Sequence, residues 1–542
     1  MTSIVRRTTI VLVLLSLLAP MTARAHLERP TAFPDGTGRI PKYRTSGPVL
    51  LVCNGTTARA VDRQPQSHAL RNLRLAARCR DDGYSSIQAA VNAVRKKGSR
   101  IKILPGTYRE RANRTPPACE KALGPKPRSY KEQFRCPHAE NLIAIIGDRR
   151  PGDGKRLCDA AVCNLQIEGT GARPEDVVIR GGFNKKGDWA KLNGIRGDRS
   201  DGLYLKNFTV ELFEFNSIYI LETDGFVIDD VVTRYNDEYG FLTFAVDHGV
   251  YKNCETYGNG DSGIYPGSAS DLNSDSDKTA PLERWAIEIK NCSSHHSALG
   301  YAGTAGNSVY VHDNRFFKNQ AGIATDSIYP DHPGLPQDHG WFEDNLIYSN
   351  NNNYTEKYVQ SGRCDKKPSK IGYEKGVVCT VTPAPVGTGM VIAGGNHNYL
   401  HDNKVWDNWR TGFMLLAVPA AIRNETDPTK QFDTSHFNFF VENVMGTSPS
   451  GKTLANGIDF WWDDQGEGNC WQGNKPIEGR AITHNTLYPG GLPTCAEGGS
   501  KPIPVNPYKS GSVVSCATYD RDDEFFRDPP ACDFYDTPER PE

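Results

Sequence analysis

The chain has 542 residues, is 38% hydrophobic and contains 52 Gly, 35 Pro and 5 Met. This length allows a large core, and the frequent Gly and Pro residues favour short strands and turns over a bundle of long helices. The formal net charge is −1, and no nucleic-acid partner is expected.

The charge is unevenly distributed along the chain. Residues 26–150 carry 25 Lys and Arg against 10 Asp and Glu, whereas residues 151–542 carry 35 against 54. A basic N-terminal third can hold an acidic glycan. A solvated surface that neutralises its acidic neighbour is the favoured interpretation.

The N-terminus has the pattern of an export signal, residues 1–25. Arg6 and Arg7 precede an apolar run at 10–19, and an Ala-Arg-Ala sequence ending at Ala25 marks a cleavage site. No later segment is apolar enough to span a bilayer. We therefore expect a secreted, extracellular monomer without a membrane span in the mature chain.

The chain contains 14 Cys, an even number that fits an oxidising compartment and structural disulfides. Sequence alone leaves their connectivity open. Local spacing favours five pairs, namely Cys119–Cys136, Cys158–Cys163, Cys364–Cys379, Cys470–Cys495 and Cys516–Cys532.

A short helix is predicted at Ile87–Lys97, where Ser85 and Gln88 form a capping box and Gly98 ends the helical pattern. A strand at Arg100–Leu104 follows, and then a Pro-Gly turn. A helix at this point would cover the open edge of the first coil of a sheet.

Short β-branched segments then recur around an Asn or Asp anchor. The first intervals between anchors are 23, 23, 38, 23 and 31 residues, which is a period of 23 with insertions of 15 and 8. This pattern predicts one coil of a parallel β-helix per repeat, with equivalent side chains stacked about 4.8 Å apart. The anchors are Asn207, Asp230, Asn253, Asn291, Asn314, Asn345, Asn403, Asn443 and Asn485.

The repeat fixes three further expectations. Cys254 and Cys292, each one residue after an anchor, should be neighbours on adjacent coils. Residues 268–282, 354–386 and 418–435 interrupt the period and should leave the solenoid as loops. We assign the chain to four parts: 1–25 signal peptide, 26–80 N-terminal extension, 81–495 β-helix and 496–542 C-terminal disulfide-containing tail.

Several motifs resemble the pectin-lyase-like superfamily. The segments SIQAAVNAV and IKILPGTYRE, followed by Asn-anchored coils, resemble its right-handed parallel β-helix proteins over residues 80–490. NDEYGF, GNGDSGIYPG and SALGYAGT are similar to secreted bacterial members of unestablished function. The resemblance implies an all-β, right-handed parallel β-helix. It implies no single activity, because lyases, hydrolases, esterases, epimerases and noncatalytic proteins share this fold.

The diagnostic motifs of these enzymes are absent. The order of the polygalacturonase-like motifs fails, and YGFLTF shares only Tyr239-Gly240-Phe241 with mannuronan epimerases, without their Asp-Pro-His-Asp signature. Pectate-lyase chemistry needs carboxylate ligands for calcium and a basic group beside the substrate carboxylate. The sequence contains such residues in no diagnostic arrangement.

Alignment on the anchors nevertheless places polar residues on one wall. Glu238 and Asp261 each stand eight residues after an anchor, with His295 and His296 on the next coil, and these four are the predicted catalytic residues. Polar turn positions that merely face water are an equal alternative. The predicted substrate-binding residues are Tyr239, Tyr265, Tyr301, Lys318, Trp462 and Asp463.

Calcium is the cofactor that the sequence suggests. Asp271, Asn273, Asp275 and Asp277 alternate as in calcium loops, but Ser276 stands where an EF-hand has Gly. A disordered acidic loop is the favoured alternative.

The sequence thus predicts a secreted protein that acts on extracellular polysaccharide, by uronate-type lyase or epimerase chemistry or, as a third option, by glycoside hydrolysis. The competing hypothesis is a noncatalytic glycan-binding or cell-surface structural protein. Both hypotheses name a polysaccharide or cell-surface glycan as the partner.

Overall fold

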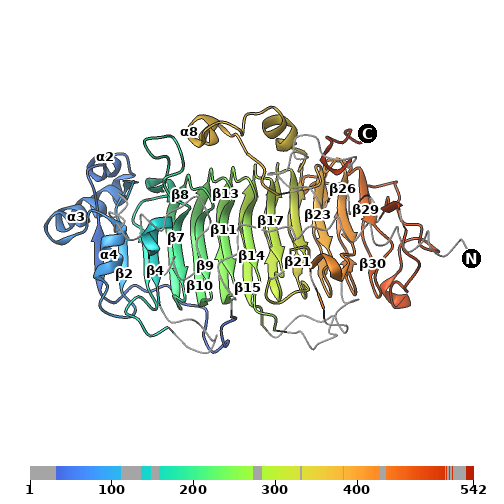
Figure 1. Ribbon diagram of the computed structural model, residues 1–542, viewed down its shortest axis with the longest axis horizontal. Coiled ribbons are helices and arrows are strands. Elements are labelled where there is room, and N and C mark those ends of the chain that lie inside the picture. Colours follow the sequence, from blue (N-terminus) through green and yellow to red (C-terminus); the bar gives the residue numbers. More distant parts are fainter. Residues whose placement is uncertain are drawn as a thin grey trace, which may run out of the picture.

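The structure is a computed structural model in which the chain winds into an elongated stack of coils (Figure 1). Several predictions lie wholly or partly outside the described residues: the signal peptide, the calcium loop beyond Asp271, the loops 268–282 and 418–435, and the pairs Cys119–Cys136 and Cys516–Cys532. The described residues are 32–110, 136–147, 158–272, 284–329, 332–382, 384–423, 425–426, 435–506, 508–509, 512, 516 and 533–542.

One face of the stack is a 10-stranded parallel sheet, whose strands cross the front of Figure 1. Neighbouring coils pair in register, as Phe241 with Ile264. The strands in spatial order are β4 (Asn141–Ile146), β7 (Asn193–Asp198), β9 (Asn216–Leu221), β11 (Tyr239–Phe244), β14 (Ser262–Gly267), β17 (Leu299–Thr304), β20 (Ala321–Asp326), β23 (Thr388–Ala393), β26 (Thr411–Leu416) and β29 (Ile458–Trp462).

The remaining 20 strands form two parallel ladders. The first ladder comprises β1 (Val49–Val52), β2 (Arg100–Ile103), β5 (Gln166–Gly169), β8 (Leu203–Glu211), β10 (Asp224–Arg234), β12 (Asp247–Lys252), β15 (Ile287–Lys290), β18 (Val309–His312), β21 (Trp341–Glu343), β24 (Tyr399–His401), β27 (Phe439–Val441) and β30 (Cys470–Gln472). Strands β8 and β10 run through both ladders and join them. The second ladder adds β3 (Gly106–Tyr108), β6 (Val177–Arg180), β13 (Glu255–Tyr257), β16 (Ser293–His295), β19 (Arg315–Phe317), β22 (Leu346–Tyr348), β25 (Lys404–Trp406) and β28 (Val444–Met445).

The three ladders enclose one apolar interior. Ile, Val, Leu and Phe side chains from successive coils stack in it, and most are fully buried. Such ladders satisfy the backbone groups of every coil except those at the two ends of the stack. The predicted all-β, right-handed parallel β-helix is confirmed.

The N-terminal end of the stack is covered by helices α2 (Thr57–Val61), α3 (Gln66–Asp82) and α4 (Ile87–Ala93). Helix α4 is the predicted capping helix, but Ser86 caps it instead of Ser85, and it ends at Ala93 because Val94 is extended and buried. Gln88 makes no capping box. Its side-chain amide pairs with the backbone of Ala144 on the open edge of β4.

The solenoid begins earlier than predicted. Strand β1 pairs with β2 in parallel, so the first coil includes residue 49, which the predicted boundary at residue 81 left outside. The Cys53–Cys79 disulfide, which was not predicted, ties the end of β1 to α3. The remaining short elements of the described chain are α7 (Pro137–Glu140), η1 (Pro174–Asp176), η2 (Thr355–Gln360), α8 (Pro368–Ile371), η3 (Tyr373–Lys375), η4 (Ala420–Arg423), η6 (Cys495–Glu497) and η8 (Asp533–Tyr535).

The predicted column of anchors shifts by one residue after Asn291. The pairing of β18 with β15 and of β19 with β16 places Asp313 beside Asn291, and Asn314 beside Cys292. Asn291 and Asp313 share a left-handed corner conformation, with φ of 53° and 55°. The prediction missed the shift because an Asp-Asn pair fits an Asn or Asp anchor at either position.

The later anchors therefore form an inner column of buried Asn side chains. Asn345 Oδ1 accepts from the backbone and side-chain N–H groups of Asn314, and Asn345 Nδ2 donates to Asn403 Oδ1 at 3.0 Å. The same contacts continue to Asn474, so the column ends there and does not reach the predicted Asn485. A second inner column consists of Asn319, Asn350, Asn408 and Asn456.

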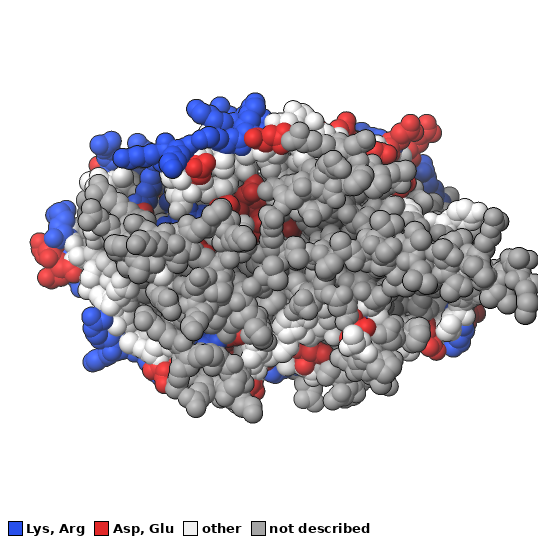
Figure 2. All heavy atoms as spheres, in the orientation of Figure 1, with Lys and Arg blue, Asp and Glu red and all other residues white. Residues whose placement is uncertain are grey.

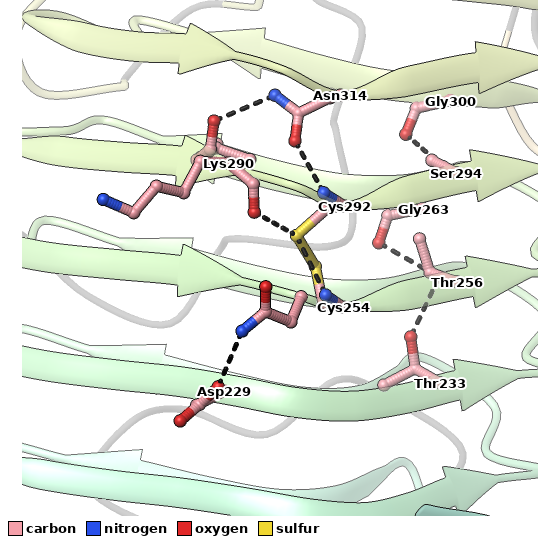
Figure 3. Close-up of a disulfide and its surroundings, with 12 residues drawn as sticks. Asp229, Thr233, Cys254, Thr256, Gly263, Lys290, Cys292, Ser294, Gly300 and Asn314 are labelled. Carbon is pink, nitrogen blue, oxygen red and sulfur yellow. Dashed lines mark hydrogen bonds between the residues drawn. A yellow bond between two sulfur atoms is a disulfide. The ribbon is translucent and has the colours of Figure 1, made fainter. Parts of the chain in front are cut away.

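Three predicted disulfides are present, and the predicted neighbours Cys254 and Cys292 form a fourth. Cys254 and Cys292 lie on adjacent coils with their Cα atoms 4.4 Å apart and form a bond (Figure 3). Figure 3 also shows Asn314, whose Oδ1 accepts from the Cys292 N–H at 2.9 Å, so the disulfide continues directly into the Asn column. The other three are Cys158–Cys163, Cys364–Cys379 and Cys470–Cys495.

The largest insertion, residues 354–386, leaves the solenoid as predicted, and we call it the excursion. Its described part contains η2, α8 and η3 and no strand. It turns back along the stack, where Ser369 N–H donates to Gly187 O and Arg180 forms an ion pair with Glu374. In Figure 1 it lies along one edge of the molecule, with α8 near β8. Among the described residues, no helix is long and apolar enough to cross a membrane.

Candidate functional site

A cluster of carboxyl and phenol groups lies on the outer face of the 10-stranded sheet. The register of β11 with β14 places Glu238 and Asp261 at equivalent positions on adjacent coils, as the repeat predicted, and the Asp261 N–H donates to Glu238 O at 3.1 Å. Asp261 is 7% exposed. We call the group formed by Glu238, Tyr239, Asp261, Tyr265, Asp326 and His332 the acidic cluster.

Burial controls the charge of its two aspartates. Desolvation raises the pKa of Asp261 to about 7, although the Tyr239 hydroxyl donates a hydrogen bond to it, and the nearby Asp326 adds to the rise. Desolvation likewise raises the pKa of Asp326 to about 6. Thr304 donates to both Asp326 oxygens, at 2.8 and 2.9 Å, which limits that rise.

The two tyrosines connect the aspartates to a histidine. The rings of Tyr239 and Tyr265 meet edge to face at 5.0 Å, and the Tyr265 hydroxyl lies 3.4 Å from His332 Nε2. Burial and the neighbouring carboxylates raise the pKa of both tyrosines well above the ordinary value. Both phenols therefore stay protonated at neutral pH and act as hydrogen-bond donors.

The excursion forms one wall beside the cluster. Val381 N–H donates to Gly260 O at 2.9 Å, and a Cβ on Gly260 would lie 2.1 Å from Cys379 O. Because Gly260, directly before Asp261, has no side chain, the excursion can cross close to this coil. Figure 2 shows acidic side chains at the floor of a hollow on this face, next to the edge where the excursion lies.

Exposed lysines line the rim above the hollow. Lys366, Lys367 and Lys370 project from the excursion around α8, and Lys367 Nζ donates to Lys186 O on the neighbouring loop at 3.0 Å. Figure 2 shows this basic band along the same edge of the molecule. A substrate in the hollow would meet acidic groups on the floor and basic groups on the rim.

The predicted histidines lie on a different surface. In register, His295 is equivalent to Tyr257, on the second ladder, whereas Ala298 is equivalent to Asp261, beyond the corner. The His295 ring stacks between Tyr257 and Phe317, at 5.0 and 4.8 Å. Its Nε2 lies 3.1 Å from Glu255 Oε1. His296, in a left-handed corner, is exposed, with its pKa lowered to about 4 by desolvation and by His295.

Two predicted substrate-binding residues face the interior. Tyr301 and Trp462 are fully buried in the core of the solenoid, because the alternation along β17 and β29 turns them inward. This corrects the prediction that they contact substrate. Asp463 is also buried, and it accepts from the N–H groups of Ala417 and Gln465, which stabilises a turn. Lys318 is exposed at a corner.

Sequence reasoning missed His332 as a site residue. It follows β20 in a loop outside the repeat, so no anchor column points to it. Asp326, three coils beyond Glu238, ends β20, and its equivalents on neighbouring coils are Thr304 and Ala393. The signal that was available is a carboxylate at the end of β20 between neighbours that carry none.

No protein-family model and no curated protein sequence matches this chain significantly. Among solved structures it is similar to the A-modules of two Azotobacter vinelandii mannuronan C-5 epimerases. For AlgE4 the identity is 12%, over 75% of this chain and 94% of that one, with a TM-score of 0.41. For AlgE6 it is 14%, over 73% and 95%, with a TM-score of 0.36. Pectate lyase Pel9A is 12% identical over 82% and 79%, with a TM-score of 0.34. These likenesses concern the fold and identify no activity.

Proposed function

We propose that this protein is secreted and acts on an acidic extracellular polysaccharide by acid/base chemistry, as a uronate lyase or epimerase. The observation that carries the proposal is Asp261, a buried carboxyl with its pKa near 7 that accepts a hydrogen bond from the Tyr239 phenol. A general base works best when its pKa lies close to the operating pH. Structural carboxylates with ordinary pKa values do not have this property.

Uronate chemistry requires removal of the proton next to the substrate carboxylate. Asp261 is the base in this proposal, and its raised pKa makes it a stronger base than a solvated aspartate. Asp326, with a pKa of about 6, is the second titrating group and in its protonated form can donate a hydrogen bond to the substrate carboxylate. The lysines of the excursion would attract the polyanion to this face.

The tyrosines complete the proposed reaction. After proton removal, Tyr239 or Tyr265 is placed to donate a proton, because burial keeps both phenols neutral. Protonation of the leaving glycosidic oxygen gives a lyase, whereas return of a proton to the sugar carbon from the opposite face gives an epimerase. The calcium ligands predicted at 271–277 have no part in these steps.

Assays on a panel of polyuronates test the proposal, with ultraviolet absorbance for unsaturated products and proton NMR for epimerised residues. Asp261→Asn, alone and with Glu238→Gln, should abolish turnover, and Tyr239→Phe should lower it at least about 100-fold, the typical contribution of one acid/base group. Asp313→Asn, an exposed carboxylate at a corner, is the matched control and should retain full activity.

The same assays decide against the proposal if Asp261→Asn turns over at the wild-type rate. Binding of polyuronate without any turnover by the wild type supports the competing noncatalytic glycan-binding function. Circular dichroism of each variant confirms that a loss of activity is not a loss of fold.

A further inference from the structure

A cluster of two imidazoles and a carboxylate lies at a corner of the solenoid, outside the acidic cluster. Asp338 Oδ1 lies 2.8 Å from His339 Nδ1 and 3.0 Å from His397 Nδ1. The possible ligand atoms of the three residues all lie within 4.8 Å of one another. His339 is buried, and the other two are half-buried.

The fold places the two histidines one above the other. Pairing of β21 with β24 makes His339 and His397 equivalent on adjacent coils, and both have a left-handed backbone, with φ of 52° and 50°. Their rings stack at 4.9 Å and 15°, and the His397 ring stacks in turn on Phe437 at 5.2 Å. Stacking fixes both ring planes, so both Nδ1 atoms are held toward the same carboxylate oxygen.

The corner itself does not require histidine. The equivalent residue on the preceding coil is Ser308, with φ of 51°, and on the following coil it is Phe437, with φ of 52°. Left-handed backbone is favoured by Gly, Asn and Asp. The backbone conformation therefore does not explain why two adjacent coils both carry a histidine here, with an aspartate beside them. The explanation must lie in the chemistry of these side chains.

The surroundings of Asp338 differ from those of an earlier carboxylate at this corner. Asp247 is engaged by the Arg284 guanidinium at 2.6 and 3.0 Å. The ion pairs of Asp338 within the described part of the chain are instead with two imidazoles, His339 and His397. Neutral imidazole and carboxylate are ligands for divalent transition metals.

We propose that Asp338, His339 and His397 form a binding site for a divalent transition-metal ion of the Zn²⁺ class. Two His and one carboxylate leave a coordination position open to solvent. Tetrahedral Zn²⁺ with bonds of about 2.0 Å needs donor atoms about 3.3 Å apart, so the observed arrangement requires side-chain shifts of order 1 Å. Calcium prefers an all-oxygen ligand set and should not compete.

Isothermal titration of the metal-depleted full-length protein with Zn²⁺, supported by elemental analysis, tests the site. His397→Phe copies the residue of the next coil, keeps the ring stack and removes one donor. The variant should bind one equivalent of Zn²⁺ fewer than the wild type. If it still binds this Zn²⁺, its affinity should fall by more than the roughly 10–100-fold that loss of an outer-shell partner costs. His339→Asn, which tolerates the left-handed backbone, and Asp338→Asn should do the same.

The matched control is His484→Asn, which removes an exposed histidine elsewhere and should leave the stoichiometry unchanged. Excess Ca²⁺ should not displace the Zn²⁺. Zn²⁺ should raise the unfolding temperature of the wild type but not of His397→Phe, and without metal the two should unfold at similar temperatures. Equal Zn²⁺ stoichiometry and affinity in the wild type, His397→Phe and His339→Asn would overturn the proposal.

Discussion

At the scale of single residues, Asp261 shows how burial sets both chemistry and stability. The residue is 7% exposed, and desolvation raises the pKa of its carboxyl to about 7 in the folded chain, whereas an unfolded aspartate titrates near pH 4. A raised folded pKa means that the folded state holds its proton more tightly than the unfolded state does. The resulting stabilisation is complete below about pH 4 and is lost as the pH rises through about 7.

Asp261→Asn should therefore change the pH dependence of unfolding. The free energy of unfolding of the variant minus that of the wild type should rise by up to about 4 kcal/mol between about pH 4 and about pH 8. The reason is that the amide of the variant does not ionise. Urea unfolding at several pH values measures this difference. Asp463 titrates in the same direction, but it is present in both proteins and cancels in the comparison. A difference that is independent of pH would contradict the assigned pKa.

The sequence predicted part of the site at this scale. Glu238 and Asp261 were found because a shared offset from consecutive anchors puts side chains on one wall of a solenoid. His295 was placed on the wrong face because a corner of the coil lies between it and the position equivalent to Asp261. That position is only three residues away in sequence, but it lies on another face of the solenoid. His332 lies outside the repeat, so only the three-dimensional packing of the loop after β20 brings it to Tyr265.

At the scale of the elements, the Asn columns replace apolar packing inside the coils. The side chain of Asn345 takes part in four hydrogen bonds, with the backbone and side chain of Asn314, with Val311 O and with the Asn403 side chain. All lie in the buried interior, where an unsatisfied donor or acceptor costs about 1–3 kcal/mol. Removal of this side chain takes a partner from both N–H groups of Asn314 and from Val311 O on the preceding coil, whereas Asn403 Oδ1 still accepts from the Asn345 backbone N–H.

Asn345→Ala should accordingly lower the free energy of unfolding by about 3 kcal/mol, as several buried polar groups lose a partner at once. Denaturant unfolding measures the change. Asp344→Asn is the control, since Asp344 is the exposed neighbour at the corner and surface changes usually stay within about 0.5 kcal/mol. Equal stability of the wild type and Asn345→Ala would show that the column is dispensable.

The elements also show what periodicity can and cannot predict. A 23-residue period with β-branched flanks was enough for the parallel coils and for the Cys254–Cys292 contact, because stacking makes equivalent residues neighbours. The register slipped after Asn291, where either residue of an Asp-Asn pair fits the anchor. Strand β1 was missed because α2, α3 and α4 separate it from β2, and this spacing hides the first coil from a search for repeats.

At the scale of the whole molecule, the solenoid brings opposite charges to one edge. The excursion leaves the stack after β22 and returns along it to the loop at 184–187, carrying its lysines over coils that lie far earlier in the sequence. The carboxyl groups of the acidic cluster lie on the sheet beside it. A polyanionic chain on this face would be attracted by the rim and would reach groups that burial keeps partly protonated.

Replacement of Lys366, Lys367 and Lys370 by Ser should therefore weaken binding of a polyuronate by about tenfold at low ionic strength, if each exposed charge contributes about 0.5 kcal/mol. The difference from the wild type should shrink as salt is added, because the Debye length falls to about 8 Å at physiological ionic strength. Arg74, Arg78 and Arg80 on α3 are equally exposed, and their replacement by Ser changes the net charge by the same amount at the end of the stack. Equal weakening by both triple variants would mean that net charge alone governs binding. Selective weakening by the lysine variant would locate the glycan beside the acidic cluster, where the Asp261→Asn variant tests its chemistry.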